Sequence, residues 1–447
     1  MLSSIEHLNN LVNAVVWGPP LMVLLIGTGV YLSFRLGWLQ LTHFLLIWRS
    51  TMGHLFSGRS EADAGELSAF QAVSSAMAAT VGVGNIVGVS TALYWGGPGA
   101  LFWMWITAGV GMATKFSEVV LGMKYRQVKA DSGEIVGGPM YYIADGLGRK
   151  WLAGAYAFLT GAAALGIGNM VQANTVAASL YETFSLPRPI AGGCVVALVA
   201  VVILGGVRRI GRTTSYLVPL MAVLYLVGGV VILLRYASAL PDAFATIITS
   251  AFTPAAPVGA WGGATVMLAM RYGLARGIFS NEAGLGSASI VHAQAKNTPV
   301  GQGFWGMWEV CVDTLIVASV TGLVIMVTGV LGQPDTSPGL LAAAAFAQGL
   351  PGVGDYLVFI CLILFAYSTM LTWSFYGGQA WEYLFGKVAV IPYRILFLVF
   401  LYIGATGGLR LVWDVSDTLN GMMAIPNLIA LLVLAKVVVR EKQATLS

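Results

Sequence analysis

Two apolar segments of the chain carry small and polar residues at their centres. The first, residues 68–91, reads SAFQAVSSAMAATVGVGNIVGVST, and the second, residues 271–286, reads RYGLARGIFSNEAGLG. Glycine weakens a helix and lets the main chain approach a ligand closely. At bilayer depth an interrupted helix is tolerated only where its freed N–H and C=O groups find partners. Both segments are therefore candidate binding sites.

Two other interpretations apply to the first segment. Residues 82–88 read GVGNIVG, which has the spacing G-x-G-x-x-x-G and lacks the preceding strand of a dinucleotide-binding loop. Small residues also let membrane helices pack closely against one another. Close packing therefore stays open as the alternative to a binding site.

Composition identifies the environment of the chain. Hydrophobic residues make up 57% of the 447 residues and charged residues 9%, against about 25% charged in soluble domains. The net charge of +4 gives no support for nucleic-acid binding. The first 16 residues contain no Lys or Arg, so no cleavable signal is predicted. We predict an all-α integral membrane protein in the lipid bilayer, with about eleven spans near residues 17–35, 66–94, 97–124, 152–180, 189–206, 213–234, 259–295, 303–331, 353–385, 391–407 and 411–437.

The distribution of basic residues predicts the topology. Of the 23 Lys and Arg residues, 17 fall in segments on one side of the predicted spans and three on the other. The positive-inside rule then places the N-terminus outside and the C-terminus in the cytoplasm of a cell (plasma or inner) membrane. The two interrupted spans begin on opposite sides, each as the first of five, which is typical of inverted-repeat transporters. The predicted parts are 1–65 (extra helix and cytoplasmic linker), 66–237 (first repeat), 238–440 (second repeat) and 441–447 (tail).

Three blocks of sequence resemble one transporter family. They read AATVGVGNIVG (78–88), GGPGALFWMWITAGVG (96–111) and ARGIFSNEAGLGSA (275–288). Over essentially the whole chain the sequence resembles the alanine or glycine:cation symporter family, although Gly109 stands where a larger apolar residue is expected. The resemblance implies import of small neutral amino acids, alanine or glycine, with sodium as the coupling ion and no organic cofactor. It also implies a fold of the leucine-transporter type with an extra N-terminal span.

An amino-acid zwitterion needs opposite partners at its two ends, and interrupted helices offer both from their main chain. We expect the N–H groups of Val83, Gly84 and Asn85 to bind the carboxylate. The ammonium is expected to face carbonyls around Gly277, Ile278 and Ser280.

Side chains are expected to select the substrate. Asn169 and Gln172 are three residues apart, so they share a helix face, although hydrogen bonding between helices is an equal alternative. Trp373 is predicted to cap a small apolar chamber with Ile278 and Phe279, but it can also be an ordinary core or lipid-facing aromatic. Thr80 completes the predicted pocket.

Sodium is a hard cation, so we expect oxygen ligands. The family fold implies a site made by the Ser368 and Thr369 hydroxyls and the Ala78 and Val81 carbonyls. Back-bonding of the two hydroxyls to their own helix is the alternative. A second ion is expected at four polar residues, of which Asp313 is costly inside a span unless paired: Thr80, Asn85, Ser280 and Asp313.

Other charges within the spans are expected to hold the scaffold or form gates. Lys115 and Glu118 are three residues apart, and we expect them to pair with each other. Asp414 or Asp417 is an expected outer-gate partner for Arg271. The roles of Arg276, Glu282 and Glu309 stay open.

Three other functions are alternatives to sodium symport for this sequence. In a proton-coupled transporter Glu282, Asp313 or Glu309 would titrate, and a passive channel would need no matched pair of interrupted helices. An enzyme is disfavoured, because Cys194, Cys311 and Cys361 match no metal or redox spacing and the four histidines are scattered. The sequence carries no signal for an oligomeric state.

Overall fold

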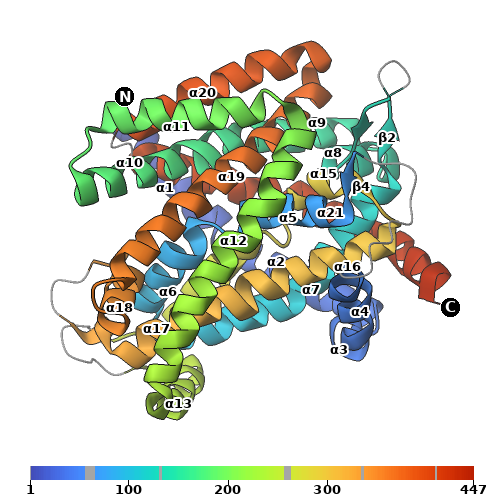
Figure 1. Cartoon of the computed structure of the whole chain (residues 1–447). Helices are drawn as coiled ribbons and strands as arrows, with labels where there is room; N and C mark the ends of the chain where they lie inside the picture. Colours follow the sequence, from blue (N-terminus) through green and yellow to red (C-terminus); the bar gives the residue numbers. More distant parts are fainter. Residues whose placement is uncertain are drawn as a thin grey trace.

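The computed structural model describes residues 2–55, 66–129, 133–255, 263–333, 337–407 and 410–446. These residues are almost entirely helical (Figure 1). Seven of the helices are long and apolar enough to cross a membrane, or eight if the pair Ala69–Thr80 and Gly84–Gly96, bent by 47°, is one span. The predicted all-α membrane protein is therefore the observed class.

A helix or a run of consecutive helices lies at each predicted span, except that residues 259–262 lie outside the described residues. The elements are α2 (Pro19–Arg35); α5 (Ala69–Thr80), the π-helix η1 (Gly84–Gly88) and α6 (Val89–Gly96); α7 (Gly99–Lys124); α9 (Lys150–Leu165), η3 (Gly166–Met170) and α10 (Val171–Phe184); α11 (Arg188–Ile203); α12 (Gly206–Arg235); α14 (Val266–Asn281) and α15 (Ala288–His292); α16 (Pro299–Val310), η5 (Cys311–Ala318) and α17 (Ser319–Thr328); α19 (Gly354–Phe385); α20 (Val390–Thr406); and α21 (Arg410–Leu446).

Shorter elements connect these helices or extend the N-terminal part. They are α1 (Leu2–Val16), α3 (Leu39–Thr42), α4 (Phe44–Leu55), α8 (Pro139–Tyr141), η2 (Tyr142–Gly146), η4 (Ala237–Ala239), α13 (Leu240–Phe252), η6 (Val330–Gly332), α18 (Leu341–Gly349) and η7 (Lys387–Ala389), with the strands β1 (Leu67–Ser68), β2 (Gln127–Val128), β3 (Ile135–Val136) and β4 (Ala295–Lys296).

Local sequence explains where the interrupted helices begin. Ser68 and Gln71 form a capping box at the start of α5, in which each side chain accepts the other residue's N–H, so two donors of the first turn are satisfied. Thr265 accepts the N–H of Leu268 at the start of α14. These caps fix the first turns of both helices before either interruption.

The interrupted helices pack against the centre of the molecule. Helix α14 packs against α6 and α7, while α5 packs against α12 and α19. Strands β1 and β4 pair in parallel, with Leu67 opposite Ala295 and Ser68 opposite Lys296. This ladder joins the start of α5 to the chain after α15.

The short elements gather at opposite ends of the molecule. Helices α13 and α18 lie at one end of the bundle, whereas β2 and β4 lie towards the other (Figure 1). The long helices, including α12 and α19, extend between these two ends.

Candidate functional site

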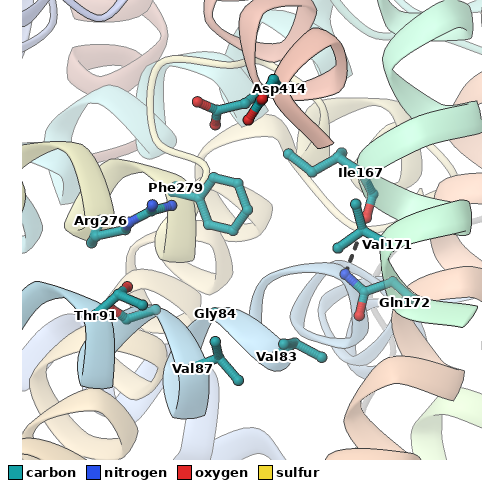
Figure 2. A pocket seen from close by; sticks show the side chains of 12 residues that line it. Val83, Gly84, Val87, Thr91, Ile167, Val171, Gln172, Arg276, Phe279 and Asp414 are labelled. Carbon is teal, nitrogen blue, oxygen red and sulfur yellow. Dashed lines mark hydrogen bonds between the residues drawn. The ribbon is translucent and has the colours of Figure 1, made fainter. Parts of the chain in front are cut away.

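Two cavities meet at the first interrupted span. The first, which we call the upper cavity, is lined by Arg276 and Asp414 and has a volume of about 160 Å³. The second, the lower cavity, is lined by Trp373 and Asn420 and has a volume of about 30 Å³. Five residues line both cavities: Val83, Gly84, Ile167, Gln172 and Phe279. Figure 2 shows Phe279 and Arg276 on one side of the upper cavity, facing Ile167 and Gln172 on the other.

The first break lies between α5 and η1. Helix α5 ends at Thr80, and the next residue, Val81, has the non-helical angles φ −75° and ψ 86°. The Asn85 side chain closes the turn, because its Oδ1 accepts the Gly82 N–H at 3.0 Å. A Cβ on Gly84 would lie 3.5 Å from the Phe279 ring, so the broken main chain closely approaches α14.

Asp313 connects the two interrupted helices. Its Oδ1 accepts a hydrogen bond from Asn85 Nδ2 at 2.8 Å, and its Oδ2 accepts one from the Ser280 hydroxyl at 2.9 Å. The Thr314 hydroxyl donates to Oδ2 at 2.7 Å. Three of the four predicted ligands of a second sodium ion are therefore together, while the Thr80 hydroxyl points back to the Ala76 carbonyl at 3.4 Å.

The predicted first sodium site is also assembled around α5. The hydroxyls of Ser368 and Thr369 donate to the Ala78 carbonyl oxygen at 3.2 and 3.0 Å. Both hydroxyls also lie 2.9 Å from the Phe365 carbonyl of their own helix, so back-bonding and the contact between helices coexist. A Cβ on Gly82 would lie 2.9 Å from Thr369 Oγ1, which places this hydroxyl directly beside the break.

The second interruption lies at the C-terminal end of the predicted segment 271–286, at Gly284 and Gly286 and not at Gly273 and Gly277. Helix α14 continues to Asn281, and the chain then turns at Glu282 (φ 55°), Gly284 (φ 103°) and Gly286 (φ 80°). These left-handed angles suit glycine but are unusual for glutamate. The second break therefore occupies residues 282–287.

This position changes the surroundings of the predicted ammonium contacts. The Ile278 carbonyl accepts the Glu282 N–H at 2.9 Å. A Cβ on Gly277 would lie 2.2 Å from Thr107 Oγ1, so Gly277 faces α7. Of the second-segment residues predicted to bind substrate, Phe279 lines both cavities, whereas Gly277, Ile278 and Ser280 line neither.

The two predicted amides differ in position. Gln172 lines both cavities, and its Nε2 donates to the Ile167 carbonyl at 3.0 Å (Figure 2). Asn169 donates to the Phe397 carbonyl at 2.6 Å and lines neither cavity. Trp373 lines the lower cavity. It packs directly on Gly168, where an added Cβ would lie 2.2 Å from the Trp373 Cβ.

Sequence reasoning did not place two residues with polar side chains in the lower cavity, which they line. Asn420 on α21 is 2% exposed, and its Oδ1 has no partner among the described residues. Glu282, whose role was left open, lines the same cavity, and the Ser287 hydroxyl donates to it. The polar content of the last span was the available signal for Asn420.

Lys115 and Glu118 do not pair as expected. Lys115 Nζ lies 3.3 Å from Glu309 Oε1, and the other Glu309 oxygen lies 3.1 Å from His292 Nε2. Glu118 Oε1 instead accepts the N–H groups of Gly284 and Gly286 at 2.9 and 3.0 Å. The prediction from spacing is wrong because Lys115 Nζ and Glu118 Oε1 each bind a partner distant in sequence.

Charged residues face one another around the upper cavity. Arg276, Asp414 and Asp417 line it, and the Arg276 guanidinium lies 5.7 Å from the centre of the Phe279 ring. Arg271 shares a neighbouring cavity of about 130 Å³ with Arg276 and Asp417. Both arginines therefore share a cavity with Asp417, one of the two carboxylates that were expected to pair with Arg271.

The half-buried side chain of Arg126 lies beyond the spans, next to β4. The Arg126 guanidinium donates to the carbonyls of Ala293 and Ala295 at 3.1 and 2.8 Å. Burial lowers its pKa from the ordinary value of an arginine. Its hydrogen bonds hold the chain that follows α15.

An all-helical bundle with apolar spans and a polar cavity at a broken helix is the architecture of a membrane transporter. The chain belongs to the sodium:alanine symporter family, whose sequence model matches residues 2–444. It is therefore a transporter of the symporter class and not an enzyme.

Two relatives in sequence are named as symporters. The chain is 47% identical to the sodium/alanine symporter AgcS of Methanococcus maripaludis, over 97% of this chain and 96% of that protein. It is 34% identical to the probable sodium/glutamine symporter GlnT of Bacillus subtilis, over 98% and 90%. A solved manganese transporter of Eremococcus coleocola is 17% identical, with a TM-score of 0.48 over 83% of this chain and 78% of that one.

Proposed function

We propose that this protein imports alanine or glycine together with sodium by alternating access across the cell membrane. The observation that carries the proposal is the shared use of the first break. The Ala78 carbonyl receives the Ser368 and Thr369 hydroxyls, and Gly82 and Gly84, a few residues further on, line the lower cavity. Ion and solute therefore act on one broken helix.

The proposed topology is eleven spans, an extra N-terminal helix followed by two inverted five-helix repeats. Helices α13 and α18 belong to segments predicted outside, and β2 and β3 belong to a segment predicted in the cytoplasm. Strands β1 and β4 lie at the ends of predicted spans that face the cytoplasm. The separation of these helices and strands to opposite ends of the bundle supports this topology (Figure 1). The N-terminus is then outside and the C-terminus cytoplasmic.

The proposed sodium ligands are oxygen atoms of α5, of the residue that follows it, and of α19. They are the carbonyls of Ala78 and Val81 and the hydroxyls of Ser368 and Thr369, a donor set that suits a hard cation. We place the substrate carboxylate at the N–H groups of the first break, near Val83 and Gly84, because helix N-termini favour anions.

The size of the lower cavity favours a small substrate. Its volume of about 30 Å³ is walled in part by Ile167, Phe279 and Trp373. A hydrogen or methyl side chain fits beside these apolar groups more readily than a glutamine side chain does. Alanine and glycine are therefore preferred over the substrate named for GlnT.

The sodium gradient supplies enough free energy for accumulation. A tenfold gradient contributes about 1.4 kcal/mol, and a potential of about 100 mV adds about 2.3 kcal/mol per charge. One sodium ion can therefore support accumulation of a neutral solute by roughly several hundredfold.

Uptake of radiolabelled alanine and glycine into proteoliposomes tests the proposal. We expect uptake under an inward sodium gradient and none when sodium is replaced by potassium or choline. Absence of sodium-driven uptake of both amino acids would contradict the proposed function. A pore would instead give current without dependence on the amino acid.

Proton coupling is a second candidate, favoured by one observation. Glu282 lines the lower cavity, and Lys115, Glu309 and His292 form a buried chain of side-chain contacts. Uptake driven by a pH gradient in sodium-free buffer would favour this version.

A further inference from the structure

We propose that Asn420, together with Gln172 and Glu282, binds the ammonium group of the transported amino acid, an inference that rests on the proposed function. The three side chains come from separate parts of the chain, namely α21, α10 and the end of α14. All three line the lower cavity. Their side-chain oxygens form a set of hydrogen-bond acceptors that the glycines of the two interrupted segments do not predict.

Two of these residues carry buried acceptors without a donor. Gln172 is 6% exposed and Asn420 is 2% exposed. Within the described residues, Gln172 Oε1 and Asn420 Oδ1 have no hydrogen-bond partner. The Gln172 amide is oriented by its Nε2, which donates to the Ile167 carbonyl at 3.0 Å. Since a buried polar group without a partner is unfavourable, both oxygens favour a ligand that brings N–H donors.

The third acceptor is the Glu282 carboxylate. Glu282 has φ 55°, a left-handed conformation that is costly for a non-glycine residue. Such strain is typical of residues held in place for function. The carboxylate adds an acidic group to the cavity that both amides line, so the set suits a cationic donor.

A primary ammonium matches this set chemically. It carries three N–H donors, and charge-assisted hydrogen bonds are stronger than neutral ones. The main chain of the first break lines the same cavity at Gly82, Val83 and Gly84 and is the proposed partner of the carboxylate. The amino acid therefore spans from the first break to α10 and α21, and α-amino acids with an unmodified ammonium are preferred.

Binding of L-alanine and N-methyl-L-alanine to the full-length protein in sodium buffer tests the inference. The N-methyl compound lacks one N–H donor, so the wild type should bind alanine about tenfold to a hundredfold more tightly. Asn420→Ala should weaken alanine binding by about tenfold or more. It should not weaken N-methylalanine binding, because the methyl group takes the vacated space. The ratio of the alanine affinity to the N-methylalanine affinity should therefore fall towards one.

Two variants isolate the role of the acceptor. Asn420→Asp keeps an acceptor oxygen and should keep the preference for alanine. Asn169→Ala removes another buried amide whose Oδ1 has no partner among the described residues, but Asn169 lines neither cavity. That variant should leave the ratio of the two affinities at its wild-type value.

Specific results would overturn the inference. Equal wild-type affinity for the two compounds would do so even if Asn420→Ala failed to fold. A loss of both affinities by the same factor in Asn420→Ala would indicate a packing role and would also overturn it. Normal sodium-driven alanine uptake accompanied by either result would refute the ammonium site while leaving the proposed function intact.

Discussion

At the scale of single residues, the first break brings the proposed ion and substrate contacts within a few positions of each other. Ala78 receives two hydroxyls from α19, and Gly82 is so close to Thr369 that a Cβ would lie 2.9 Å from its hydroxyl. Movement of α19 relative to α5 must therefore change both sites. This is the physical basis that we propose for coupling.

Thr369→Val should lower the affinity for sodium while leaving the shape of the side chain almost unchanged. The valine keeps the branched side chain but removes the hydroxyl oxygen, which we expect to cost about 1.5 kcal/mol. The sodium concentration for half-maximal alanine uptake should then rise about tenfold. Thr372→Val is the matched control, because the Thr372 hydroxyl donates to the Ser75 carbonyl, away from Ala78. Equal sodium dependence in both variants would contradict the assignment of Thr369.

At the scale of elements, the second break is held by side chains of other helices. Glu118 Oε1 on α7 accepts the N–H groups of Gly284 and Gly286 and also Asn427 Nδ2 of α21, at 2.9, 3.0 and 2.7 Å. The left-handed turn after α14 thus exchanges helical hydrogen bonds for bonds to a buried carboxylate. Helices α7 and α21 are tied together through this segment.

Glu118→Ala should destabilise the protein strongly. It leaves three buried donors without their acceptor, a change of the kind that costs about 3–5 kcal/mol when a buried charged partner is removed. Thermal unfolding of the detergent-purified protein should show a clear fall in Tm. Glu6→Ala removes an exposed glutamate and should leave the Tm unchanged. A wild-type Tm for Glu118→Ala would refute this role.

The sequence predicted where the helices lie, but it did not predict which glycines interrupt a helix and which allow close packing. Long apolar segments locate the spans because hydrophobic length is a local property. Gly273 and Gly277 predicted unwinding, yet both allow close packing on α7: a Cβ would lie 2.4 Å from the Ala100 carbonyl oxygen and 2.2 Å from Thr107 Oγ1 respectively. Close approach and chain reversal require the same residue, so composition alone does not separate them.

The candidate site was predictable in part for a similar reason. Gln172 was identified because an amide is conspicuous in an apolar helix. Asn420 and the partner of Lys115 depend on contacts between segments far apart in sequence. Those contacts follow only from the three-dimensional arrangement of α7, α10, α16 and α21.

At the scale of the whole molecule, the two ends of the bundle are built differently. The upper cavity lies beside Arg276 and Asp417, and α1 contacts the same carboxylate through Asn13 Nδ2 at 3.3 Å. At the end with the strands, β1 and β4 join the start of α5 to the segment after α15. Under the proposed alternating access, we expect release of substrate on that side to require these two segments to separate.

A cross-link between β1 and β4 should therefore block transport reversibly. Ser68 and Lys296 are directly paired in the parallel ladder, where neighbouring strands lie about 4.8 Å apart, a separation compatible with a disulfide. The double variant Ser68→Cys and Lys296→Cys should lose alanine uptake on oxidation and regain it on reduction. Each single variant under the same oxidant is the control, and undiminished uptake by the cross-linked protein would exclude separation of the strands as a step.

The most direct test of the account is the linkage between sodium and alanine binding to the purified protein. Because binding free energies are reciprocal, sodium should tighten alanine binding, and alanine should tighten sodium binding by the same factor, which we expect to be about tenfold or more. In Thr369→Val this factor should approach one. Alanine affinity that is identical in sodium and choline buffers would contradict the claim that one broken helix holds both ligands.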